Sequence, residues 1–157
     1  MLSAGPGYKP GNARNRGAPR PEGKTMDFVS TRVITDDIKR LVRFYEAISG
    51  LAATWYTDDF AELKTPSCTL AIGSQRTMDL FGAGAARPAD NHSAILEFRV
   101  EDVDKEFEKL EKVIGDVVQK PTTQPWGNRS LLFRDPDGNL VNFFTPVSAA
   151  AIKKYEI

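Results

Sequence analysis

Histidine is the scarcest chemically useful residue in this sequence: the 157 residues contain one, His92. A site built from several imidazoles, which are common ligands of transition metals, is therefore excluded. Cysteine is equally scarce, and the lone Cys68 cannot form an internal disulfide, which favours a reducing cytoplasm. No apolar run approaches the roughly 20 residues of a membrane-spanning helix, so we expect no membrane partner. The 21 basic and 21 acidic side chains balance, which argues against a nucleic-acid partner.

The first 25 residues differ in composition from the rest. They are rich in Gly, Pro, Asn and Arg, and hold five basic side chains against one acidic side chain. Such a composition cannot bury enough apolar surface to order itself, so residues 1–25 are predicted to be a disordered basic leader. A basic arm that touches an anionic partner is the alternative, and Met26 is an alternative start. Residues 147–157 are expected to form a C-terminal tail, either a short helix or a frayed end.

Two segments of the remaining chain repeat one pattern. Strand-like runs occur over Phe28–Thr35 and over Ala94–Val100. After each run come an aspartate and then apolar residues at helical spacing. Shifting the first segment by 65 positions superimposes Asp37 on Asp102. Further strands are expected over Ala52–Tyr56, Thr77–Phe81, Val117–Gln119, Arg129–Arg134 and Asn139–Phe144, and over Glu62–Ile72 with some irregularity. The sequence therefore predicts an α+β fold: one domain over 26–146 made of two βαβββ halves, about 27–82 and 93–146.

The second half closes on the segment Asp-Pro-Asp-Gly-Asn at 135–139. Pro136 presets φ for a tight turn, Gly138 can take a positive φ, and the Asp and Asn side chains can bond to nearby amides. The duplicated βαβββ unit, the strand-Asp-helix start of each half and this hairpin resemble the vicinal-oxygen-chelate superfamily. That superfamily includes glyoxalase I, extradiol dioxygenases, and fosfomycin- and bleomycin-resistance proteins.

The resemblance covers about Asp27 to Pro146. It implies that each half curls four strands around a concave face, with its helix outside, and that a homodimer forms cavities between paired halves. Strand alternation predicts which side chains enter these faces. Leu96 and Phe98 suit packing on the following helix, so the inward residues of that strand are Ile95, Glu97 and Arg99. The same shift gives Ser30, Arg32 and Ile34 in the first half. On the closing strands we expect Asp79 and Phe81 to correspond to Asn142 and Phe144.

Metal-dependent members of the superfamily place His, Gln or Glu on the first strand of each half and Glu on the last. The resemblance carries these positions to Ser30, Asp79, Ile95 and Asn142. Of these, Asp79 alone is a good anionic ligand, whereas Ile95 has no donor and the other two are weak neutral donors. Because a catalytic metal needs about three good protein ligands, we expect a metal-free site with no cofactor. His92 lies in a loop with the wrong strand parity to replace one of them, and Cys68 suits a small buried position.

The remaining site candidates suit an organic ligand. Trp126 lies in a Pro-Trp-Gly loop similar to the segment that borders the ligand cavity in bleomycin-resistance-type relatives. It can stack on a planar ring or pack as a lid over the hairpin. Glu97 and Asp79 can receive cationic or hydrogen-bond-donating groups, Asn142 and Ser30 can supply neutral hydrogen bonds, and Phe81 can add apolar wall. Arg99 either bonds a polar ligand or pairs with another inward charge.

The sequence-based hypothesis is a cytoplasmic homodimer that binds or sequesters a planar or cationic organic compound without a metal. In character it is closest to the bleomycin-resistance-like members. The alternative is a metal-dependent lyase, isomerase or dioxygenase of the same superfamily, with Asp79 anchoring a divalent ion. A third option is an interaction module that uses the basic leader. Whether catalysis occurs, and on which compound, is left open by these residues.

Overall fold

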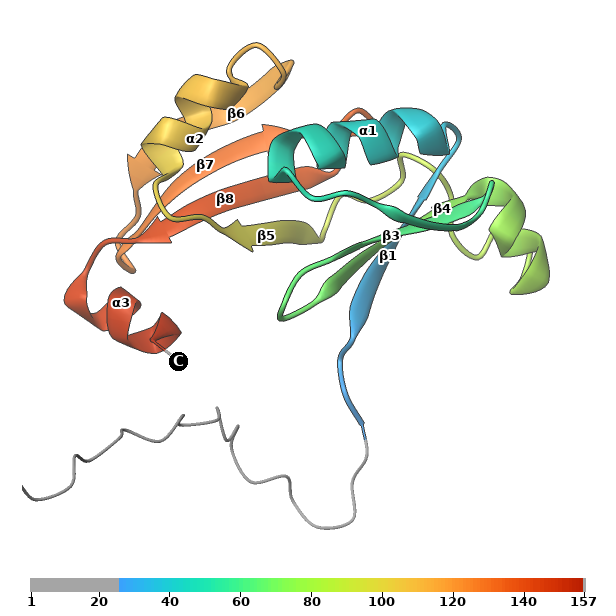
Figure 1. Cartoon of the computed structure of the whole chain (residues 1–157), viewed down its shortest axis with the longest axis horizontal. Helices are drawn as coiled ribbons and strands as arrows, with labels where there is room; N and C mark the ends of the chain where they lie inside the picture. Colours follow the sequence, from blue (N-terminus) through green and yellow to red (C-terminus); the bar gives the residue numbers. More distant parts are fainter. Residues whose placement is uncertain (1–25, 157) are drawn as a thin grey trace, which may run out of the picture.

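The computed structural model describes residues 26–156, in which one βαβββ order occurs twice (Figure 1). The first half comprises β1 (Ser30–Thr35), α1 (Ile38–Ser49), β2 (Thr54–Thr57), β3 (Phe60–Lys64) and β4 (Thr69–Ser74), followed by the 3-10 helix η1 (Gln75–Leu80). The second comprises β5 (Ile95–Arg99), α2 (Val103–Leu110), β6 (Asp116–Thr123), β7 (Asn128–Arg134) and β8 (Leu140–Pro146), followed by α3 (Ala149–Tyr155). The predicted leader lies outside the described residues, in which no helix is long and apolar enough to span a bilayer.

Both long helices begin where the sequence predicts. The Asp37 carboxylate accepts a hydrogen bond from the backbone N–H of Arg40, at 3.0 Å, and thereby caps α1. Asp102 caps α2 in the same way, accepting from two backbone N–H groups of the first turn. Gly50 ends α1 in the left-handed region, at φ 69°, where a glycine has no Cβ to clash.

The strands form two four-stranded sheets with the orders β1-β4-β3-β2 and β5-β8-β7-β6. In each sheet the first strand runs parallel to the last, and the other neighbours are antiparallel. Arg32 lies opposite Ala71 in the first sheet, and Glu97 lies opposite Asn142 in the second. The predicted α+β fold of two βαβββ halves is therefore confirmed, and Ala71 is the first-half counterpart of Asn142.

Two of the strands predicted for the first half differ in the structure. The run Glu62–Ile72 is interrupted at Pro66, and β3 and β4 are joined by a turn in which the backbone N–H of Thr65 donates to the carbonyl of Cys68, at 3.0 Å. A proline cannot donate to a sheet ladder, which accounts for the break. The segment Thr77–Phe81 is not a strand: it lies on η1 and at its C-terminal end. The closing strand of this half is therefore β4.

One hydrophobic core joins the two halves on the helix side of the sheets. Its largest fully buried side chains come from both, with Tyr45 of α1 and Phe133 and Phe143 of the second sheet fully enclosed. The ring of Tyr45 lies 6.4 Å from that of Phe98, and the ring of Phe44 lies 6.4 Å from that of Phe133. In Figure 1 both α1 and α2 cover this side, which leaves the opposite sheet faces to form the concave surface.

The predicted turn at 135–139 fastens this core. Gly138 has a φ of 83°, and the Asp135 carboxylate accepts from the backbone N–H groups of Asp137 and Asn139, both at 2.9 Å. The hydroxyl of Tyr45 donates to the same carboxylate at 2.7 Å. Burial, and then the nearby Asp135 carboxylate, raise the pKa of Tyr45 far above its ordinary value. The turn thus connects α1 of the first half to the closing hairpin of the second.

Candidate functional site

The strongest polar feature of the concave surface is a pair on β5 and β8. The amide nitrogen Nδ2 of Asn142 donates to Oε1 of Glu97 at 3.0 Å. The amide oxygen Oδ1 of Asn142 is buried and has no hydrogen-bond partner within residues 26–156, and the residue is 9% exposed. The hydroxyl of Ser130 on β7, a residue 2% exposed, is likewise buried without a partner there. Ser130 lies opposite Phe144 in the ladder, one pleat from Asn142 on the same face.

These groups define the chemistry that this face offers. A buried acceptor without a donor costs about 1–3 kcal/mol, and a ligand that supplies an N–H or O–H group recovers that cost. Glu97 is exposed, and its carboxylate faces the concavity. Two acceptors and one hydroxyl therefore favour a ligand that carries a cationic group or hydrogen-bond donors.

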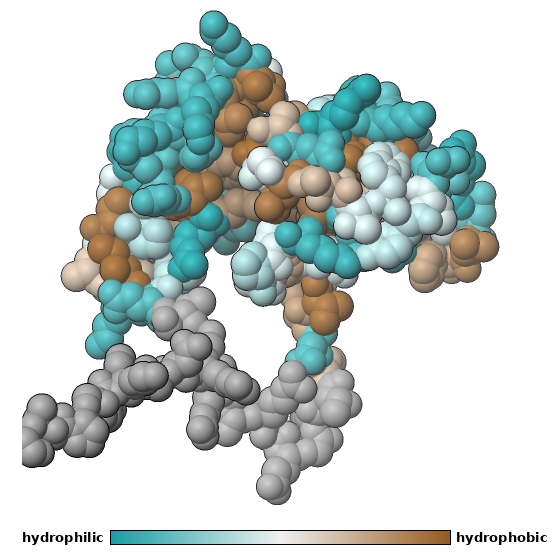
Figure 2. Space-filling model, viewed as in Figure 1, coloured by the Kyte–Doolittle hydropathy of each residue, from teal (hydrophilic) through white to brown (hydrophobic). Residues whose placement is uncertain are grey.

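A cavity of about 420 Å³ lies where the two halves meet. Its polar wall comes from β5, through Glu97 and Arg99, and its other wall comes from Phe28 and the β3–β4 turn of the first half. Cys68 of that turn is half-buried in this wall, with Sγ 3.9 Å from the Val29 carbonyl oxygen. Figure 2 shows the surface hollowed between the part formed by α3 and the start of β1. We refer to the cavity between β5, Phe28 and the β3–β4 turn as the seam cavity.

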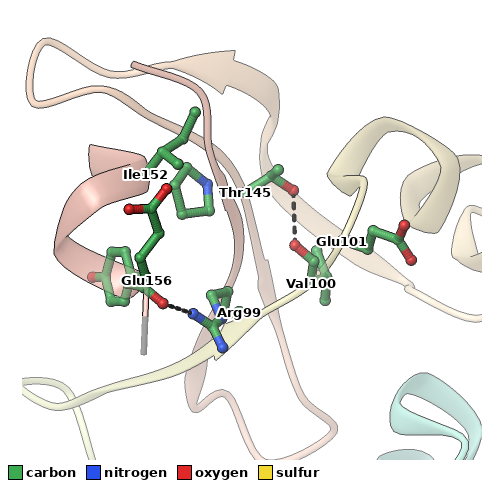
Figure 3. Close-up of a pocket in the computed structure, with 8 residues that line it drawn as sticks. Arg99, Val100, Glu101, Thr145, Ile152 and Glu156 are labelled. Atoms are coloured by element: carbon green, nitrogen blue, oxygen red, sulfur yellow. Dashed lines mark hydrogen bonds between the residues drawn. The ribbon is translucent and has the colours of Figure 1, made fainter. Parts of the chain in front are cut away.

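Arg99 also lines a second cavity of about 410 Å³, between β5, β8 and α3 (Figure 3). Its Nη1 donates to the carbonyl oxygen of Tyr155 at 2.8 Å, and its guanidinium lies 5.7 Å from the Tyr155 ring. That ring in turn lies 5.3 Å from the ring of Phe144. The C-terminal segment thus contains a helix, as one of the two sequence alternatives held, and Arg99 anchors it across the inner face of the second sheet.

Trp126 is 66% exposed, in the turn between β6 and β7. The carbonyl of Gly127 accepts from the backbone N–H groups of Val147 and Ser148, so this turn lies at the base of α3. In the β7–β8 ladder Asn128 pairs with Pro146, which is four residues from Asn142, or about 13 Å along a strand. One chain therefore does not bring the indole to Asn142, and stacking by Trp126 stays a prediction.

The predicted first-half residues are more scattered. Ser30 begins β1 and is exposed. Asp79 is exposed on η1, which Figure 1 places beyond the first sheet, on the side away from β8, so its expected place on an inward closing strand is wrong. Phe81, 70% exposed, follows η1 and lies 5.4 Å from the guanidinium carbon of Arg32. Among residues 26–156, the buried side-chain polar atoms without a hydrogen-bond partner all belong to the second half.

Ser130 and Ala71 are the inward residues that sequence reasoning missed. Leu131 and Phe133 are the core-facing residues of β7, so strand alternation alone places Ser130 inward. The signal for Ala71 was Pro66, which marks the end of one strand and the start of the next.

A model of the Glyoxalase/Bleomycin resistance protein/Dioxygenase superfamily matches residues 27–143. The chain belongs to this superfamily. It is 27% identical over 125 residues to the uncharacterized protein YraH of Bacillus subtilis (strain 168), covering 76% of this chain and 98% of that protein. A superfamily enzyme from Burkholderia phytofirmans PsJN matches with a TM-score of 0.71 at 16% identity, covering 78% and 100% of the two chains. A superfamily protein from Nocardioides matches with a TM-score of 0.65 at 20% identity, covering 80% and 87%.

The metal positions of metal-dependent superfamily members do not fit a metal in this chain. With β4 as the closing strand, those positions become Ser30, Ala71, Ile95 and Asn142. Ala71 and Ile95 have no donor atom, and the other two offer only neutral oxygens, which are weak ligands for a transition metal. Residues 26–156 also contain no cluster of three His, Cys, Asp or Glu side chains that could hold an ion. His92 is exposed and joins no such cluster.

Proposed function

We propose that this superfamily member is a cytoplasmic small-molecule-binding protein that binds or sequesters a planar or cationic organic compound without a metal. The Glu97–Asn142 pair carries the proposal, because it combines an exposed carboxylate on the concave side of β5 with a buried, unpaired amide oxygen beside it on β8. Glu97 also lines the seam cavity, so a ligand there can reach this residue. A cationic or donor group of the ligand bonds Glu97, and its planar part lies against the apolar wall.

The size and composition of the seam cavity support a compact organic ligand. A volume of about 420 Å³ is within the usual range for small-molecule pockets. Phe28 and Ile95 contribute exposed apolar surface to its wall, and Glu97 and Arg99 contribute opposite charges. Apolar walls with a few polar groups are typical of sites that bind organic compounds.

Calorimetric titration with benzylammonium and with planar aromatic amines tests the binding. Glu97→Gln is expected to weaken binding by at least about tenfold, because a hydrogen bond to a charged group contributes more than a neutral one. Glu108→Gln, a matched change on the exposed face of α2, leaves the affinity unchanged. Equal affinities for wild type and Glu97→Gln would contradict the proposed site.

Metal analysis tests the second part of the proposal. Protein purified without chelators is expected to contain divalent metal at well below one ion per chain, and EDTA is expected to leave ligand affinity unchanged. The missing donors at Ala71 and Ile95 support this expectation. Stoichiometric metal that EDTA removes together with ligand binding would overturn it.

We also propose that the protein is a homodimer. The apolar side chains of Phe28, Leu80, Phe81 and Ile95 are exposed, and a second chain covering some of them would gain apolar burial. Light scattering after gel filtration is expected to give twice the chain mass of 17.4 kDa. A monomer at micromolar concentration would rule out this part of the proposal without affecting the binding test.

A further inference from the structure

Arg32 occupies, in the first sheet, the place that Glu97 occupies in the second. Both are the third residue of their strands, and their partners across the parallel ladder are Ala71 and Asn142. The two halves therefore present opposite charges at equivalent positions of their inner faces. This reversal raises the question of what the cation of the first half binds.

The side chain of Arg32 is held by two aromatic rings. Its guanidinium carbon lies 4.7 Å from the ring centroid of Phe60 and 5.4 Å from that of Phe81. Phe60 belongs to β3, so the arginine must cross β4 to reach it. The side chain has room to cross there because the inner-face residues of β4 are the small Ala71 and Gly73. Cation–π contacts of this kind hold a guanidinium through its flat faces and leave the N–H groups of its edge free.

Arg32 differs from most other described arginines in its lack of a polar partner. Five described arginines pair with a carboxylate: Arg40, Arg76, Arg87, Arg129 and Arg134. Arg99 donates to a backbone carbonyl. Within residues 26–156, Arg32 forms neither an ion pair nor a side-chain hydrogen bond, although the rings fix its position. Arg43, on the helix side, also lacks such a partner there but has no ring contact.

The other charges on this inner face satisfy one another. Lys64 donates to the Tyr56 hydroxyl at 2.7 Å, that hydroxyl donates to Glu62 at 3.1 Å, and Lys64 lies 3.5 Å from the same carboxylate. Asp79 on η1 forms no ion pair with Arg32. The positive charge of Arg32 therefore remains uncompensated on this face within the described residues.

We propose that Arg32 is the centre of an anion site on the first sheet, which binds an organic oxyanion through the free edge of its guanidinium. The fork of donors matches a carboxylate or a phosphate in two parallel hydrogen bonds. Phe81, 70% exposed, offers its ring to the apolar part of the same compound. An aryl compound bearing a carboxylate or a phosphate group has this combination. The site is separate from the Glu97–Asn142 pair and does not depend on the proposed function.

Calorimetric titration at millimolar ligand with benzoate, phenyl phosphate, acetate and inorganic phosphate tests the site. Wild type is expected to bind benzoate and phenyl phosphate, and Arg32→Gln to weaken both by at least about tenfold. Phe81→Leu is expected to weaken the aryl anions by about two- to fivefold and to weaken acetate less, because the nearer Phe60 ring still holds the guanidinium. Arg43→Gln, the matched arginine without ring contacts, keeps wild-type affinity.

Several outcomes would overturn the proposal. These are absence of benzoate and phenyl phosphate binding to the wild type, equal binding by Arg32→Gln, or an equal loss in Arg43→Gln. Equal affinities for benzoate and acetate would overturn the role of Phe81. Glu97→Gln separates this site from the proposed function: it is expected to leave benzoate affinity unchanged while weakening benzylammonium, so each proposal can fail without the other.

Discussion

The two halves of this protein share a backbone plan and differ in what they present on their inner faces. In the second half, Glu97 accepts from Asn142 and the buried Ser130 hydroxyl has no partner among the described residues. In the first half, the equivalent place holds Arg32 between two rings, beside a methyl group at Ala71. The duplicated fold thus holds an acceptor pair at this position in one half and a cation at the same position in the other.

The outer, helix-facing residues of the two halves changed far less in character. Val33 and the equivalent Phe98 both pack against the core, and Ile38 and Val103 both begin a helix by turning an apolar side chain inward. These positions must fill one shared core, where losing or adding volume is costly. Inner-face residues are free of that constraint, which accounts for the reversal of charge between Arg32 and Glu97.

The largest expected effect concerns whether the halves unfold together. Phe133→Ala in the second half is expected to lower the free energy of unfolding by about 3–5 kcal/mol, and Leu63→Ala in the first by about 2–5 kcal/mol. Because both side chains belong to one buried cluster, each variant is expected to show one cooperative transition by circular dichroism and by fluorescence. Two separate transitions, with each variant shifting one of them, would show that the halves are independent.

The second prediction concerns two glycines with positive φ. A Cβ at Gly127, at a φ of 91°, would overlap the hydroxyl of Ser148, whereas a Cβ at Gly50 would meet nothing within 4 Å, at a φ of 69°. Gly127→Ala is expected to cost about 2–4 kcal/mol, from strain and overpacking together, and to displace α3. Gly50→Ala is the control, at about 1 kcal/mol from strain alone. Equal chemical denaturation midpoints for the two variants would contradict a close packing of α3 on the second half.

The third prediction concerns the hydrogen bond between Tyr45 of the first half and Asp135 of the second, and it has a defined pH dependence. Tyr45→Phe is expected to cost about 1–3 kcal/mol, because it removes a donor from the buried Asp135 carboxylate. The native state raises the pKa of Tyr45 above its ordinary value of 10.0, so native Tyr45 keeps its proton where the unfolded chain loses it. This stabilisation is complete below about pH 10 and is lost as pH rises further. Wild type should therefore lose stability more steeply than Tyr45→Phe in alkaline denaturation.

Tyr56→Phe is the matched control for that comparison. Its hydroxyl is also bonded to a carboxylate, that of Glu62, but the residue is exposed and belongs to the first half alone. The change is expected to leave the midpoint of thermal unfolding nearly unaltered at neutral pH. If Tyr56→Phe lowered this midpoint as much as Tyr45→Phe does, the hydrogen bond between Tyr45 and Asp135 would contribute no more to stability than an exposed one.

Local signals allowed much of the fold to be predicted from the sequence. The aspartate caps at Asp37 and Asp102 and the turn around Gly138 act within a few residues, so their positions can be read directly. The segment Thr77–Phe81 misled because it alternates apolar and polar residues as a strand does. In the structure Met78 is buried and Leu80 is exposed on a 3-10 helix, whereas a strand would place both side chains on one face.

The candidate site was less predictable because it depends on ladder register. Glu97 and Asn142 lie far apart in the sequence, and only the parallel pairing of β5 with β8 sets them side by side. The same register separates Trp126 from Asn142 within one chain. The contacts of Arg32 depend on side-chain reach across β4, which strand alternation does not describe.

The smallest expected change in stability is at the two residues that define the comparison. Arg32→Gln and Glu97→Gln are each expected to shift the free energy of unfolding by no more than about 0.5 kcal/mol, because both side chains are exposed. Glutamine at 97 still offers an oxygen to the Asn142 amide, and the rings beside Arg32 can pack on the glutamine stem. Their ligand preferences should nevertheless change in opposite directions: Arg32→Gln loses benzoate and keeps benzylammonium, and Glu97→Gln does the reverse. If both variants lost both ligands while remaining folded, the two inner faces would form one site, and the separation into an anionic and a cationic half would be wrong.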